Sequence, residues 1–147
     1  MTILERIVAD MKQAMRDKNE VARDTLRMLK SDVGRRELEL GRAPDDAEVT
    51  EVLLRAVKTR RESLEQYEQG GRADLAEKER KEVAIIEAYL PKTMDEAEAR
   101  TTIEALAKEL SASQKKDMGR LMKEITARYR GQIDGKVASK IAGEILQ

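Results

Sequence analysis

The sequence predicts an all-α protein, and three features support that fold class. Of the 147 residues, 39% are charged and 2% are aromatic, with no Phe or Trp, so Leu, Ile, Val, Met and Ala must form the core. Long stretches rich in Glu, Lys, Arg, Ala and Leu are typical of helices, and only two prolines interrupt the chain. Apolar residues recur at spacings of three and four, which indicates amphipathic helices.

The first two helices are defined by their capping residues. Thr2 and Glu5 have the spacing of a capping box, in which a hydroxyl accepts an orphan amide and a carboxylate reaches back to the backbone. Asn19 can end this first helix and cap the second, which runs to Gly41.

A third and a fourth helix complete the N-terminal part. Asp45 or Asp46 can cap the third, which covers about residues 46–69 and ends at the Gly70-Gly71 pair. The fourth runs to Tyr89 and stops before Pro91, because a residue that precedes proline is biased away from the helical conformation.

The segment from Pro91 to Met94 is the predicted domain boundary. Asp95 is followed three residues later by Glu98, which is another capping signature. Three shorter helices are expected after it, over about residues 96–110, 114–129 and 135–146. We therefore expect a bundle of about four helices, or a pair of antiparallel hairpins, in residues 1–91 and a small three-helix domain in residues 94–147, with short loops between antiparallel neighbours.

The composition excludes several classes of site. With no Cys and no His, disulfides, thiolate chemistry, imidazole bases and ordinary zinc sites are absent, and we expect no metal and no cofactor. No apolar run approaches the roughly 20 residues that span a bilayer, so no membrane association is expected. Glu5 and Asp10 lie where a signal peptide would be apolar, which favours a cytoplasmic location.

Positive charge is concentrated near the C-terminus, although the whole chain has 29 basic and 29 acidic residues. Residues 1–92 hold 19 basic and 20 acidic side chains, a net charge of −1. Residues 93–112 hold 2 basic and 5 acidic side chains, a net charge of −3. Residues 113–147 hold 8 basic and 4 acidic side chains, a net charge of +4. Any attraction to a polyanion must therefore come from local segregation of charge, and the positive charge collects in the last two helices.

Within the predicted helix 114–129, charged and apolar residues fall on opposite arcs. Leu121 and Ile125 belong to the apolar arc, together with the two methionines and Tyr129. The basic arc and the following helix supply the candidate nucleic-acid-binding residues, which are Lys116, Gly119, Arg120, Lys123, Arg130, Lys136 and Lys140. A glycine on a basic face permits close approach of a partner's backbone, so these residues could follow a phosphate backbone.

A simpler interpretation of the same pattern stays open. A basic arc opposite an apolar arc is most often the solvated side of an amphipathic helix. Gly119 could instead permit close packing of a neighbouring helix, and the segment Gly131–Gly135 could be only a turn. Its spacing is one residue short of a phosphate-binding loop and no strand precedes it, so nucleotide hydrolysis is rejected there.

The N-terminal part holds a secondary candidate, formed by Arg23, Arg27, Lys30 and Arg60. The first three form a stripe on the second helix, beside its apolar face. Arg60 falls inside the apolar arc of the third helix, where an arginine normally needs a carboxylate partner. A side chain that reaches solvent at the edge of the bundle is the alternative explanation.

The sequence contains no recognisable catalytic residues, although intrinsic catalysis stays open. Most carboxylates lie in alternating-sign helical patterns that are typical of solvated faces. Ser111 and Ser113 lie near Lys115 and Lys116, but an exposed loop supplies neither a desolvated base nor an oxyanion hole.

Several segments of the sequence resemble the YqeY family of small bacterial proteins. They cover nearly the whole chain in the family's order, and they are Arg27–Lys30 (RMLK), Lys58–Ser63 (KTRRES), Tyr67 with Gly71–Leu75 (GRADL), Glu87–Pro91 (EAYLP), Lys116–Met122 (KDMGRLM) and Gly131–Lys136 (GQIDGK). The last two segments also resemble the tail domain of GatB, a subunit of the glutamine-dependent amidotransferase that corrects mischarged tRNA.

The resemblance implies an accessory role related to amidotransferases, with a GatB-tail-like domain that binds tRNA. It also implies association with carbon–nitrogen ligase activity that uses glutamine as amide donor, without an active site in this chain. The expected partner is tRNA or another structured RNA, and an amidotransferase or aminoacyl-tRNA synthetase subunit is a further candidate. The alternative function is a protein-binding helical adaptor that docks such a subunit.

Overall fold

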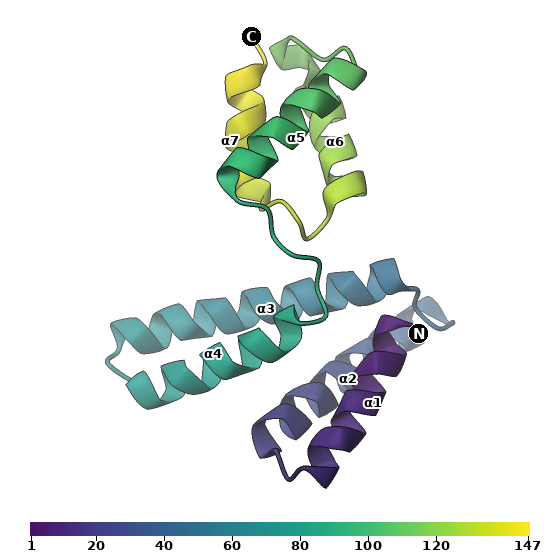
Figure 1. Cartoon of the computed structure of the whole chain (residues 1–147), viewed down its shortest axis with the longest axis vertical. Helices are drawn as coiled ribbons and strands as arrows, with labels where there is room; N and C mark the ends of the chain where they lie inside the picture. The colour runs from purple at the N-terminus through teal and green to yellow at the C-terminus, as the bar shows by residue number, and fades with distance from the viewer. The chain divides into compact units, whose positions relative to one another are not determined.

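The computed structural model describes all residues, 1–147, and is entirely helical, with no β-strand. This confirms the predicted fold class. Two compact units are present, Met1–Leu90 and Pro91–Gln147. The first contains α1 (Ile3–Arg16), α2 (Glu20–Leu40), α3 (Asp46–Gln69) and α4 (Ala73–Glu87), and the second contains α5 (Glu96–Glu109), the 3-10 turn η1 (Lys115–Asp117), α6 (Met118–Tyr129) and α7 (Gly135–Ile145) (Figure 1). Whether residues 1–91 and 94–147 fold as separate domains stays a prediction.

The N-terminal unit consists of two helical hairpins, α1 with α2 and α3 with α4 (Figure 1). Each helix contributes one side chain with no exposed surface to a common core, namely Ile7, Leu29, Leu53 and Ile86. Burial of an aliphatic side chain of this size contributes about 1.5–3 kcal/mol. Thr2 and Asp45 form capping boxes and Asn19 caps α2. The capping box at Thr2 and the cap at Asn19 were predicted, and of the two candidates Asp45 and Asp46 the first caps α3.

Tyr89 links the C-terminal end of this unit to α1 through a side-chain hydrogen bond. The residue is buried, and its hydroxyl donates a hydrogen bond to the Asp10 carboxylate on α1. The guanidinium of Arg6 lies 5.2 Å from the centre of the Tyr89 ring. Burial, and then the hydrogen bond to Asp10, raises the pKa of Tyr89, so the phenol remains a donor at all ordinary pH values.

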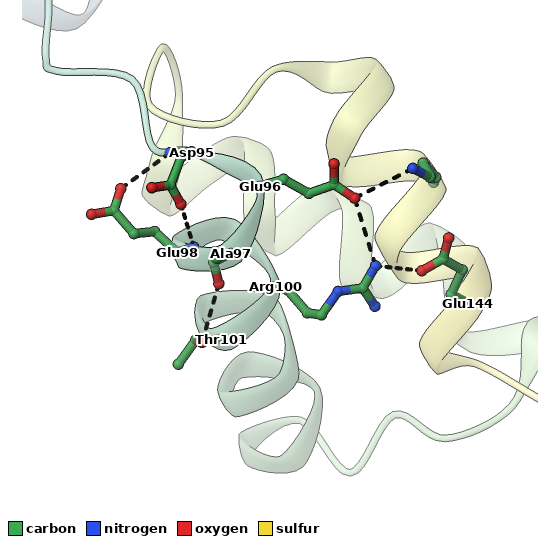
Figure 2. Close-up of polar contacts among 8 residues, drawn as sticks. Asp95, Glu96, Ala97, Glu98, Arg100, Thr101 and Glu144 are labelled. Atoms are coloured by element: carbon green, nitrogen blue, oxygen red, sulfur yellow. Dashed lines mark hydrogen bonds and ion pairs between the residues drawn. The ribbon is translucent and has the colours of Figure 1, made fainter.

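The C-terminal unit packs three helices around a second core (Figure 1). Ile103, Leu121 and Ile141, one from each helix, have no exposed surface. Asp95 caps α5 through a capping box with Glu98, which was also predicted (Figure 2). The C-terminal residue Gln147 is held at the start of η1, where its N–H donates to the Ser113 carbonyl at 3.0 Å and its carbonyl accepts from Lys115 N–H at 3.2 Å.

Two predicted helix boundaries are wrong. The helix predicted over 114–129 is a 3-10 turn followed by α6, because the Asp117 carboxylate accepts the backbone N–H groups of Ser113 and Gln114 and holds a tight turn there. Helix α4 ends at Glu87 rather than Tyr89, because the Tyr89 N–H bonds to the carbonyl of Ile86, three residues back.

No helix in the structure has the length and apolar character needed to cross a lipid bilayer.

Candidate nucleic-acid interface

The outer face of α6 and η1 carries the first group of predicted binding residues. Leu121 and Ile125 are buried and turn the opposite side of α6 toward the core. Lys116 on η1 and Arg120 and Lys123 on α6 are exposed. Lys116 lies in the 3-10 turn that leads into α6, and Lys123 lies on the exposed side of α6, opposite Leu121 and Ile125.

The three cations differ in their partners. Arg120 donates to the carbonyl oxygen of Leu110 at 2.7 Å and forms an ion pair with Asp117 at 3.3 Å. Lys116 and Lys123 have no ion-pair partner within the structure. Asp117 stays ionised, because the backbone N–H groups of Gln114 and Ser113, and then Arg120, lower its pKa. The two lysines therefore carry the uncompensated charge of this face.

Gly119 leaves the backbone between these cations accessible. The residue is exposed, and a Cβ atom built on it would meet no heavy atom within 4 Å. The alternative that Gly119 serves close packing of a neighbouring helix is therefore excluded. A partner could approach the α6 backbone at this position without displacing a side chain.

The turn between α6 and α7 holds the second group. Gly131 has a φ of +78°, which favours glycine. The carboxylate of Asp134 accepts the backbone N–H of Lys136 at 2.7 Å and so caps α7. Arg130 and Lys136 are exposed. Since α6 and α7 run antiparallel, this turn lies at the opposite end of α6 from Lys116 (Figure 1).

Lys140 belongs to an ion-pair network between α5 and α7. Its ammonium lies 3.3 Å from the carboxylate of Glu96, which is also 3.8 Å from the guanidinium of Arg100. Arg100 in turn pairs with Glu144 (Figure 2). The hydrogen bond from Arg100 lowers the pKa of Glu144, so the network stays charged at neutral pH. Glu96 of α5 thus competes with any phosphate for Lys140.

The secondary candidate does not form one site. Arg60 is buried, with 7% of its surface exposed, and its Nε donates to Glu82 at 3.1 Å. It therefore has the carboxylate partner that an interior arginine needs, and the alternative of a side chain reaching solvent is wrong. Arg23 pairs with Asp24 at 2.9 Å, while Arg27 and Lys30 are exposed without an ion pair. These residues lie in the N-terminal unit, away from α6 and α7 in the chain.

One feature was missed from the sequence, a cavity between α2 and α3 with a volume of about 380 Å³. It is lined by two rows of residues at helical spacing, Met28, Asp32, Arg35, Arg36 and Glu39 on α2, and Glu51, Val52, Arg55, Ala56, Thr59 and Arg60 on α3. The helical spacing of the two rows is present in the sequence. Because most of their residues are polar, hydrophobic periodicity does not identify them as one surface. No group of three or more acidic side chains is placed to hold a metal ion.

The molecule is thus an all-helical protein with an uneven basic surface on its C-terminal unit. The profile of the YqeY-like protein family matches residues 4–146, so the chain belongs to the YqeY-like family. This confirms the resemblance drawn from the sequence segments.

Curated relatives from fungi share this similarity. The "Altered inheritance of mitochondria protein 41, mitochondrial" of Pyrenophora tritici-repentis is 25% identical over 148 residues, which cover 98% of this chain and 81% of the relative. The protein of the same name from Clavispora lusitaniae is 37% identical over 97 residues, 64% of this chain and 56% of the relative. That of Lachancea thermotolerans is 30% identical over 107 residues, 71% of this chain and 57% of the relative.

These relatives overturn the prediction of a cytoplasmic location. The three proteins above and the relative of the same name from Eremothecium gossypii are all named as mitochondrial, which contradicts the expected cytoplasmic location. The prediction failed because acidic residues near the start argue only against a secretory signal peptide and do not distinguish among the compartments of a cell.

Proposed function

We propose that the C-terminal unit binds structured RNA through the outer face of η1 and α6 and the turn that follows. The observation that carries the proposal is the pair of exposed lysines, Lys116 and Lys123, which no carboxylate neutralises and which flank the open backbone at Gly119. Arg120, Arg130 and Lys136 extend the same basic surface. Release of counterions from the RNA would drive binding.

Recognition would depend on shape and charge. Proteins that bind splayed single-stranded bases stack them on aromatic side chains. The C-terminal unit contains one aromatic residue, Tyr129, which is half-buried and packs against the core. Contacts with phosphates and with 2′-hydroxyl groups of a folded RNA fit this surface better, with weak dependence on sequence.

Among structured RNAs we favour tRNA as the partner. The support is the resemblance of Lys116–Met122 and Gly131–Lys136 to the GatB tail. An accessory role in glutamine-dependent tRNA amidation follows from the same resemblance, with the chemistry performed by an amidotransferase and not by this chain.

The test is simultaneous reversal of Lys116, Arg120 and Lys123 to Glu. We expect the triple variant to lose tRNA binding by about 100-fold or more in a filter-binding or fluorescence titration, because three cationic contacts become repulsive. Far-UV circular dichroism should keep its helical signal, since all three side chains are exposed.

A matched control separates a local effect from one of net charge. Reversal of Lys12, Lys58 and Lys81 makes the same change in charge at exposed positions of the N-terminal unit. This control should retain most of the affinity. If the variant with Lys116, Arg120 and Lys123 reversed binds tRNA as tightly as the wild type, the proposed face is wrong.

The alternative function, a protein-binding adaptor, is favoured by a separate observation on the N-terminal unit. Several large apolar side chains are exposed there, with Met1 at 85%, Leu38 at 83% and Met15 at 50%. Met1 lines a shallow pocket on α1 together with Leu4 and Val8, and this apolar patch could dock a synthetase or an amidotransferase subunit. Salt dependence distinguishes the two functions, because RNA binding should weaken steeply between low and physiological salt and apolar docking should not.

A further inference from the structure

The cavity between α2 and α3 contains a rigidly held arginine that the RNA proposal does not use. Arg60 is more than nine-tenths buried and is fixed on two sides, by Glu82 at 3.1 Å from its Nε and by the Ala56 carbonyl at 3.2 Å from its Nη1. The acceptor of its Nη2 is the sulfur of Met28 at 3.0 Å. A thioether is a weak acceptor, so this arginine has a donor that a stronger acceptor could take.

A ligand could displace the Met28 side chain from Arg60. Its surface is 46% exposed, and its unbranched side chain adapts easily to a changed neighbour. An oxygen atom in place of the Met28 sulfur would form a charge-assisted hydrogen bond with Arg60, which is about twice as strong as a neutral one. Because Glu82 and Ala56 already orient the guanidinium, little ordering would oppose binding.

A second cation on the same wall lacks a partner. Arg55 is exposed and lines the cavity without an ion pair, whereas Arg35 is paired with Asp32 at 3.4 Å and Arg36 with Glu39 at 3.1 Å. Between these polar groups, Val52 and Ala56 give the wall an apolar strip. The cavity therefore offers two arginine donors beside an apolar surface.

The other charges of the cavity limit the ligand to a single negative charge. Asp32 and Glu39 are balanced by Arg35 and Arg36, and Arg60 is balanced by Glu82. Arg55 is then the wall cation whose charge is not balanced, and it suits a monoanion better than a dianion such as phosphate. We propose that the cavity binds a small organic carboxylate with an apolar body. The carboxylate replaces the Met28 sulfur at Arg60 and pairs with Arg55, and the body packs on Val52 and Ala56. This inference is independent of the RNA proposal.

The experiment is an NMR titration of the full-length protein with isovalerate. The expected result is saturable shifts of the Arg60 Nε–H resonance and the Met28 methyl resonance, while resonances of α6 stay unchanged. Isovaleramide has the same shape without the charge, and we expect it to bind at least about tenfold more weakly, since the charge-assisted bonds are lost. Inorganic phosphate should also bind more weakly.

A substitution that does not threaten the fold completes the test. Arg55→Gln alters an exposed side chain and should weaken isovalerate binding about tenfold. Arg61→Gln is the matched control, because Arg61 is exposed, pairs with Glu87 and does not line the cavity. The Arg61→Gln protein should bind isovalerate with the affinity of the wild type. The proposal is overturned if isovalerate shifts neither resonance, if the amide or phosphate binds as tightly, or if Arg55→Gln leaves the affinity unchanged.

Discussion

Two ion pairs of nearly equal length have different roles in the two units. In the N-terminal unit, Arg60 lies 3.1 Å from Glu82, and their side chains are 8% and 12% exposed. In the C-terminal unit, Lys140 lies 3.3 Å from Glu96, and their side chains are 61% and 54% exposed. The distance is similar, but only the first pair is separated from water.

Burial decides what such a pair does. Two charges removed from water depend on each other, because either one left alone would be buried without compensation. Two exposed charges are already solvated, contribute little to stability and exchange partners easily. We therefore expect Arg60 and Glu82 to hold α3 and α4 together, and Lys140 to be available to a phosphate in competition with Glu96.

The largest expected effect comes from breaking the buried pair. Arg60→Ala should destabilise the N-terminal unit by about 3–5 kcal/mol, because it leaves Glu82 charged and buried. Native-state hydrogen exchange of amides in α3 measures this locally, so the stability of the C-terminal unit does not obscure the result.

Two further variants define the cause of that effect. Arg61→Ala changes the neighbouring arginine, which is exposed and paired with Glu87, and should alter exchange in α3 only slightly. Arg60→Met combined with Glu82→Leu removes both charges and should recover most of the lost stability. An Arg60→Ala protein with wild-type exchange rates would refute a structural role for the pair.

A smaller effect, on RNA affinity, is expected from removing the ion pair between Lys140 and Glu96. Glu96→Gln removes the carboxylate that competes for its ammonium (Figure 2). If the C-terminal unit binds RNA as proposed, affinity should rise about threefold, and the salt dependence should increase by up to about one counterion. Titration with tRNA at several salt concentrations measures both quantities.

The control for this prediction removes an equal charge elsewhere on α5. Glu104→Gln alters an exposed carboxylate that forms no ion pair with Lys140. If Glu104→Gln raises the affinity as much as Glu96→Gln, the effect is one of net charge, and Lys140 is not a contact.

Features governed by neighbours in the chain were predictable. The caps at Thr2, Asn19, Asp45 and Asp95 follow from hydrogen bonds between residues three apart, and the sequence displays such spacings directly. The burial of Leu121 likewise follows from helical periodicity. Fold class and most helix ends could therefore be inferred without coordinates.

Features governed by distant partners were not predictable. Arg60 and Glu82 are 22 residues apart, and Lys140 and Glu96 are 44 apart. The sequence showed that Arg60 needed a carboxylate, but many of the 29 acidic residues could have supplied it. The same limit applies to the candidate surface, because a helical wheel places Lys140 on a solvated arc without showing that α5 lies beside it.

The smallest effect concerns a second carboxylate near Arg60, that of Glu79 on α4. One of its oxygens is buried without a hydrogen-bond partner. Burial raises the pKa of Glu79, and the charge of Glu82 adds to the increase, while Arg60 opposes it. An acid whose pKa is higher in the folded state than its ordinary value of 4.5 disfavours folding when ionised, so this cost is present at neutral pH and absent below the ordinary pKa.

Glu79→Gln should therefore stabilise the N-terminal unit at pH 7, by no more than about 0.5 kcal/mol. Well below pH 4.5 the wild-type carboxyl is protonated in both states, so the difference between the two proteins should disappear. Urea unfolding of both proteins at the two pH values measures this difference. A Glu79→Gln protein that is less stable than the wild type at pH 7 would mean that Arg60 holds Glu79 as a second ionic partner. The buried cluster would then be a triad and not a pair with an uncompensated neighbour.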